Sequence, residues 1–162
     1  MNELDSLSTS DLFRTYRDIL KQLTRRGIVR TSNAPAGDYA EYLVAAMLQG
    51  ELADNSEKSW DVKTKEGRRY QVKCRVISER RLAGERQLSP FRTWDFDEAV
   101  IVLFDDDYRI WRCVSLPCEV LKERSKYRKH INGFVARATD DLLNHPSATD
   151  YSDALREMAE GL

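Results

Sequence analysis

Long apolar runs, paired cysteines and zinc-binding motifs are all lacking in this sequence of 162 residues. The longest uninterrupted apolar run covers 42–48, far short of the roughly 20 residues that a membrane-spanning helix needs. The N-terminus is acidic and has no apolar segment of the kind found in secretory signals. The three cysteines cannot all pair, and neither they nor the two histidines have the spacing of a zinc site. We therefore expect a cytoplasmic protein without a membrane span or a structural zinc ion.

Glycine and proline are also few, with 7 and 4 residues, while hydrophobic residues make up 41% and charged residues 33% of the chain. This composition excludes a disordered, collagenous or low-complexity protein. A chain of this length can bury roughly 70% of its unfolded surface and needs no disulfide or metal to fold. We expect a single domain over 1–162, with an N-terminal helix at 9–26, a core at 37–138 and an acidic tail at 139–162.

The net charge of −1 hides an uneven distribution of charge along the chain. The segment 57–92 holds eleven lysines and arginines against five acids, a net charge of +6. The segment 140–162 holds six acids and one arginine, a net charge of −5. A basic central block is able to follow a phosphate backbone, although an ordinary solvated surface has the same composition.

Hydrophobic spacing changes along the chain from a helical repeat to an alternation of period two, which indicates a mixed α/β protein. In the first helix the repeat is carried by five residues: Leu12, Tyr16, Ile19, Leu20 and Leu23. The stretch 78–97 is mostly polar and shows no helical pattern. We expect helices at 9–26, 37–49, 117–128 and 150–160, strands at 60–64, 70–77, 97–104, 108–115 and 133–138, and a turn-rich connector at 31–36.

The register of the first strand pair decides whether its polar residues meet. A two-residue turn would place Asp61 opposite Val72 on the apolar face, where an unpaired carboxylate is costly. A three-residue turn over 65–67, with Gly67 in the left-handed conformation, pairs Asp61 with Gln71 instead. The sequence favours this second register, which also places Trp60 and Val62 on the apolar face.

Asp61, Gln71 and Lys73 then form one polar cluster, because residues two apart on a strand point the same way. A carboxylate, an amide carbonyl and the backbone carbonyl of Val72 are suitable ligands for a hard divalent cation. Lys73 is able to orient or deprotonate a water molecule, or to stabilise charge on a phosphate. Glu41, at the edge of the buried stripe of helix 37–49, would supply a second carboxylate. The simpler interpretation is a solvent-facing strand with an exposed Asp–Lys pair.

The same residues resemble the motif of a known family. Gly37-x-x-x-Glu41 on a helix, Ser59-Trp60-Asp61-Val62, a turn with glycine and Gln71-Val72-Lys73 together resemble the PD-(D/E)XK nuclease superfamily. The Gln-x-Lys form is similar to that of Mrr-like restriction endonucleases. The resemblance covers residues 37–77.

The resemblance implies a restriction-endonuclease-like core over 37–138, with a central mixed sheet flanked by helices. It also implies Mg²⁺- or Mn²⁺-dependent hydrolysis of phosphodiester bonds in DNA, as in restriction or repair. Asp61 matches the metal-binding acid, Gln71 the variable acid or amide, Lys73 the catalytic lysine and Glu41 the acid on the helix. An alternative is a noncatalytic module that keeps this fold to bind nucleic acid or protein.

DNA is the expected partner, and six arginines are the candidate contacts: Arg68, Arg69, Arg75, Arg80, Arg81 and Arg92. The cations of 122–129 around Tyr127 are further candidates, or else one solvated face of a helix. Trp94 and Phe96 either stack on DNA or anchor their loop to the core. A homodimer is possible, because cutting both strands with one active site per chain favours two copies.

Overall fold

The computed structural model describes residues 2–30, 35–54, 56–57 and 59–162. They form a mixed α/β fold around a six-stranded mixed sheet with the order β1-β2-β3-β4-β5-β8. Only β3 and β4 run parallel, and the other neighbours are antiparallel. The strands of this sheet are β1 (Glu51–Leu52), β2 (Val62–Lys63), β3 (Arg69–Ile77), β4 (Glu98–Asp105), β5 (Ile110–Pro117) and β8 (Thr149–Asp150).

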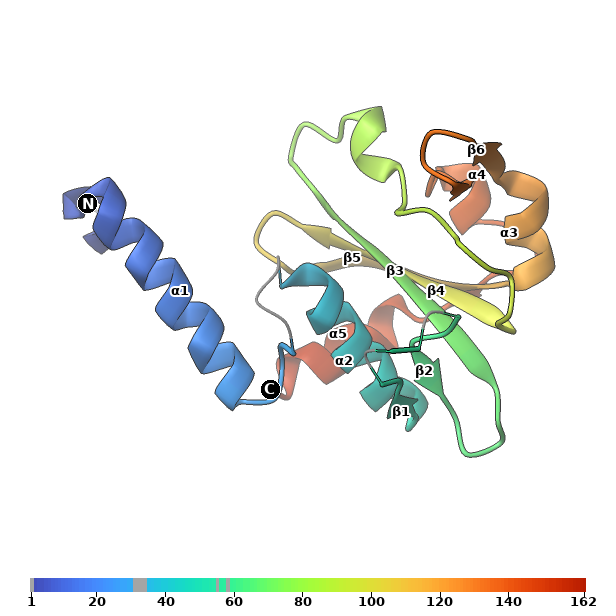
Figure 1. Cartoon of the computed structure of the whole chain (residues 1–162), viewed down its shortest axis with the longest axis horizontal. Coiled ribbons are helices and arrows are strands. Elements are labelled where there is room, and N and C mark those ends of the chain that lie inside the picture. The colour runs from blue at the N-terminus through green and yellow to red at the C-terminus, as the bar shows by residue number, and fades with distance from the viewer. Residues whose placement is uncertain (1, 31–34, 55, 58) are drawn as a thin grey trace.

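Helices cover both faces of the sheet (Figure 1). α2 (Ala36–Leu48) and α5 (Ser152–Glu160) cover one face. α3 (Cys118–Arg124), α4 (Asp140–Leu143) and a hairpin of β6 (Lys126–Arg128) and β7 (Gly133–Val135) lie on the other. Because β4 is covered on both sides, its central residues form an unbroken buried run rather than an alternating one.

The N-terminal helix stands apart from this body. A short 3-10 turn, η1 (Glu3–Ser6), precedes α1 (Thr9–Arg25), which is capped by Ser8, whose hydroxyl accepts a hydrogen bond from the Asp11 N–H. The helix projects away from the sheet (Figure 1). No helix in the described part of the chain is both long enough and apolar enough to cross a membrane.

The expected helices at 9–26 and 37–49 agree with α1 and α2 to within one residue at each end. The expected helix at 117–128 is wrong in its second half, because the chain turns extended at Ser125 and residues 126–128 form β6. The ring of Tyr127 lies 5.3 Å from that of Phe134 across the hairpin. Cross-strand packing there outweighs the helical preference of the lysines and arginines. The connector expected at 31–36 falls mainly outside the described residues.

The position of Trp60 also differs from the expectation. β2 has only two residues, and Trp60 packs against the cluster on the α3 side, whereas Val62 is buried on the α2 side. The prediction that both side chains share one face is therefore wrong. Alternation of faces holds only while the chain follows the ladder, and the ladder ends at Val62.

Parallel pairing of β3 and β4 requires a connection that crosses one face of the sheet. Residues 78–97 make this connection with one short 3-10 turn, η2 (Ala83–Arg86), and an extended stretch. As the lack of a helical pattern predicts, no α-helix forms in residues 78–97, all of which the structure describes.

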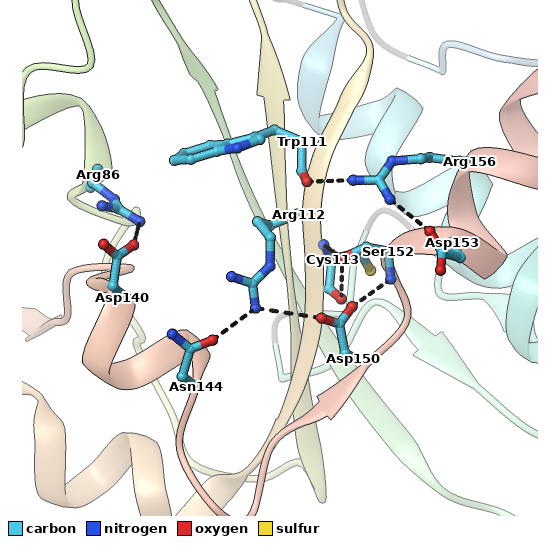
Figure 2. A network of polar contacts seen from close by, with 10 residues as sticks. All are labelled: Arg86, Trp111, Arg112, Cys113, Asp140, Asn144, Asp150, Ser152, Asp153 and Arg156. Atoms are coloured by element: carbon cyan, nitrogen blue, oxygen red, sulfur yellow. Dashed lines mark hydrogen bonds and ion pairs between the residues drawn. The ribbon is translucent and has the colours of Figure 1, made fainter.

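The acidic C-terminal segment is packed onto the sheet through ion pairs and buried leucines. Asp140 pairs with Arg86, and Asp150 with Arg112, which also donates to the side chain of Asn144 (Figure 2). Arg156 on α5 donates to the backbone carbonyl of Trp111 at 2.7 Å. Three buried leucines fix the same segment: Leu142, Leu143 and Leu155.

Candidate active site

The turn between β2 and β3 sets the register on which the candidate site depends. Val62 pairs with Tyr70, and Asp61 donates its backbone N–H to the Tyr70 carbonyl at 2.8 Å. Gly67 has a φ of +86°, the left-handed conformation expected of it. The predicted three-residue turn is confirmed, and Asp61 lies opposite Gln71.

Asp61 lies just before β2, at the point where β3 no longer has β2 as a paired neighbour. Its Oδ2 accepts a hydrogen bond from the Val72 N–H at 2.7 Å and from Gln71 Nε2 at 3.3 Å. The carboxylate thus replaces the backbone acceptor that β2 would have supplied if it continued. Within the described residues, Oδ1 of Asp61 accepts no hydrogen bond.

Lys73 lies on the same strand and is almost completely buried, with 8% of its surface exposed. Its Nζ donates to Ser89 Oγ at 3.2 Å and to the Pro90 carbonyl at 3.1 Å. The ammonium also lies 4.8 Å from the centre of the Phe91 ring. Burial lowers the pKa of Lys73, and the charge of Arg92 lowers it further, while the negative charge of Asp61 opposes both.

Glu41 reaches the site from α2. Its Oε2 accepts a hydrogen bond from Arg30 Nη2 at 2.7 Å, and Arg30 Nη1 donates to the Ala53 carbonyl at 2.9 Å. Burial and the negative charge of Asp61 raise the pKa of Glu41, and the bond from Arg30 opposes this shift. Glu41 and Asp61 are therefore close enough to repel each other.

Arg30 is a residue of this site that the sequence does not reveal. It lies before α2 in an irregular segment, so no helical or strand periodicity relates it to Glu41. Ser89 and Pro90 were also outside the predicted cluster, because they reach Lys73 across the connection between β3 and β4. Contacts of this kind depend on the path of the chain rather than on spacing.

The oxygen atoms of the cluster suit a hard divalent cation. Because the amide nitrogen of Gln71 donates to Asp61, the carbonyl Oε1 of Gln71 is left as an acceptor. Among the described residues, no three His, Cys, Asp or Glu side chains are placed to hold a metal ion. A cation here would have two carboxylates, Asp61 and Glu41, and neutral oxygens from Gln71 and the Val72 backbone.

Most of the arginines expected to contact DNA have partners within the protein. Arg68 pairs with Glu98, Arg69 pairs with Asp95, Arg75 donates to the Gln87 carbonyl, Arg81 lies over the Trp111 ring, and Arg92 donates to the Asn132 carbonyl. The sixth, Arg80, is exposed and forms no ion pair with any described residue. Five of the six arginines therefore have a contact within the protein, and their contact with DNA stays a prediction.

The aromatic side chains after Pro90 anchor their loop. The Phe91 ring lies 5.1 Å from that of Trp94 and 5.8 Å from that of Phe96, all on the α3 side of the sheet. Of the two interpretations open from sequence, the structure confirms the anchor. The loop that carries Ser89 and Pro90 to Lys73 is therefore fixed on a buried aromatic cluster.

A cavity of about 740 Å³ lies at the other end of β3, against Ile77, Asp105 and Trp111, and includes none of the four predicted site residues. The cluster instead occupies the open edge of β3. In comparisons with known proteins, the chain matches no family model and no curated protein.

Proposed function

We propose that this protein is a Mg²⁺- or Mn²⁺-dependent nuclease with a restriction-endonuclease-like core that hydrolyses phosphodiester bonds in DNA. The observation that carries the proposal is the convergence of Asp61, Gln71, Lys73 and Glu41 at the open edge of β3. The order of helix α2, hairpin β2–β3, parallel β4 and antiparallel β5 supports the same assignment.

A divalent cation bound here would act as a Lewis acid and would make water more acidic. Asp61, Glu41, Gln71 and the Val72 carbonyl are the groups that would hold it. Lys73 is fixed by two hydrogen bonds, and its lowered pKa makes its neutral amine easier to reach as a proton acceptor than that of an ordinary lysine. In its charged form, the same ammonium stabilises negative charge on the phosphate.

A noncatalytic binding module is the alternative, and the burial of Lys73 argues against it. A lysine with most of its surface buried lowers the stability of the fold, since desolvation disfavours its charged form. A binding module gains nothing from this cost, whereas a catalytic site needs a shifted pKa. DNA binding that is unchanged in Asp61→Ala, without cleavage by the wild type, would favour the module.

The metal site is tested by melting curves, without knowledge of the substrate. A cation that binds only the folded state at about ten times its dissociation constant stabilises it by about 1.4 kcal/mol. The wild type should then melt about 3 to 6 °C higher in Mg²⁺ or Mn²⁺. Asp61→Asn should abolish the shift, and Asp54→Asn, an exposed control in the same part of the chain, should retain it. A wild type that does not respond to either ion contradicts the proposed site.

We further propose that the protein acts as a homodimer in which α1 pairs with α1 of a second copy. Three apolar side chains of α1 are exposed: Leu12 (39%), Tyr16 (47%) and Ile19 (53%). Together with Leu23 they follow the alternating four- and three-residue spacing of a coiled-coil seam. Acids precede this seam, and four cations flank its second half: Arg17, Lys21, Arg25 and Arg26. An antiparallel, two-fold pair places the acidic end of each helix beside the basic end of the other.

A further inference from the structure

The β6–β7 hairpin, which the sequence did not reveal, is attached to the loop that holds Lys73. Phe91 and Phe134 exchange backbone hydrogen bonds of 2.8 and 2.9 Å. Arg92 Nη1 donates to the Asn132 carbonyl at 2.7 Å at the tip of the hairpin. Since Lys73 binds the Pro90 carbonyl on the neighbouring residue, the hairpin and the candidate site share one rigid segment.

Gly133 shows how closely the hairpin lies against this segment. A Cβ atom at this position would be 2.8 Å from Pro90 Cβ and 3.3 Å from Arg92 Nη1. The two backbones can approach to this distance only because residue 133 has no side chain. The hairpin is therefore positioned by the same residues that position Lys73.

A basic cavity of about 470 Å³ lies beside the hairpin, lined by Gln87, Lys126, Arg128, His130 and Arg137. No carboxylate lines it. Lys126, Arg128 and Arg137 are exposed and form no ion pair with any described residue. This arrangement differs from that of the two arginines of β3, since Arg69 pairs with Asp95 and Arg75 donates to the Gln87 carbonyl.

We propose that this cavity binds a backbone phosphate of the DNA substrate and so positions the strand for cleavage at the Lys73 site. Unpaired cations in a concave surface attract phosphate oxygens, and contacts of this kind fix the register of a nucleic acid without reading its sequence. Gln87 connects the cavity with β3, because its carbonyl accepts a hydrogen bond from Arg75 on β3 and its backbone forms a β-bridge with Arg137. The inference rests on the proposed function, since it deepens the assignment of DNA as the substrate.

The test compares DNA binding by the wild type and by the double variant Arg128→Gln, Arg137→Gln, measured by fluorescence anisotropy with a short labelled duplex in EDTA. Replacement of two phosphate contacts should weaken binding on the order of tenfold at low salt and reduce the salt slope by about two units. The double variant Arg14→Gln, Arg109→Gln removes the same charge from two exposed ion-paired sites and should bind as the wild type does. Lys126→Gln provides a second variant of the cavity, with an expected change of about one unit.

Binding and cleavage outcomes separate this inference from the proposed function. The inference is overturned if the salt dependence of DNA binding is the same in the cavity variants as in the wild type. It is also overturned if the wild type does not bind DNA. Binding that depends on Arg128 and Arg137, without cleavage by the wild type, supports the cavity and contradicts the nuclease. Inorganic phosphate that raises the melting temperature of the wild type alone, with an unchanged DNA slope, assigns the cavity to free phosphate and overturns the inference.

Discussion

Lys73 has an environment unlike that of a surface lysine, and its titration tests the site at the scale of one residue. Its pKa is lowered from the ordinary value of 10.5 by burial. In protein with isotope-labelled lysine, the Lys73 side-chain resonance should titrate below the ordinary lysine value of 10.5. Lys73→Arg assigns the resonance, and titration of Lys73 at the ordinary value would contradict the account.

The same shift predicts a pH dependence of stability. In the unfolded chain Lys73 holds its proton up to about its ordinary pKa, whereas the folded protein releases it at lower pH. The destabilising contribution of Lys73 is therefore fully present below the folded-state pKa and is lost as the pH rises towards 10.5. Denaturant unfolding of the wild type and Lys73→Met should show a difference that changes in this alkaline range, and a constant difference would argue against a buried charged lysine.

Single residues also show what the sequence was able to predict of the site. Asp61 and Gln71 were placed opposite each other because Gly67 fits a three-residue turn and because an unpaired carboxylate is costly on an apolar face. Both reasons are local. Arg30 and Ser89 were missed because they approach Glu41 and Lys73 through tertiary contacts that leave no periodic signal.

At the scale of elements, the β6–β7 hairpin shows where local reasoning fails. Lys126, Tyr127 and Arg128 continue the composition of helix α3, so their sequence favours a helix. Pairing with β7 and contact of Tyr127 with Phe134 decide the outcome instead. β3 and β4 were easier to predict, because their alternation or buried run extends over eight or more residues.

The contact between this hairpin and the Lys73 loop gives a prediction for Gly133→Ala. The new Cβ would meet Pro90 Cβ at 2.8 Å, so the hairpin or the loop must shift. We expect a loss of about 1 to 3 kcal/mol in the free energy of unfolding. Gly84→Ala, where an added Cβ meets no atom within 4 Å, is the control for the loss of a glycine. Equal stability of Gly133→Ala and the wild type would show that the contact is not tight.

The exposed seam of α1 predicts the oligomeric state. The wild type should sediment as a dimer of the 18.8 kDa chain, and Ile19→Lys should shift it to the monomer because the charge would be buried between the helices. Thr24→Lys adds the same charge at an exposed position of the helix outside the seam and should remain a dimer. A wild-type monomer at all accessible concentrations contradicts the pairing of α1.

For the whole molecule, charge counted along the sequence gives an incomplete account of the surface. The basic block at 57–92 indicated a phosphate-binding surface, but six of its seven arginines, Arg86 among them, have partners in the folded protein. Two acids of the C-terminal segment, Asp140 and Asp150, pair with Arg86 and Arg112. Ion pairs between residues distant in the sequence decide which charges remain free to bind phosphate. The net charge of a segment does not contain this information.

The central claim is that the cluster at the open edge of β3 hydrolyses DNA with a divalent cation, and single-turnover cleavage tests it most directly. Supercoiled, linear and single-stranded DNA are incubated with excess protein in Mn²⁺ or in EDTA. The account predicts cleavage of at least one DNA form by the wild type in Mn²⁺ alone, with a loss of about a hundredfold or more in Asp61→Asn and in Lys73→Met. The exposed control Lys65→Met should cleave at the wild-type rate. DNA left intact by the wild type, or cleaved equally by Asp61→Asn, would contradict the claim.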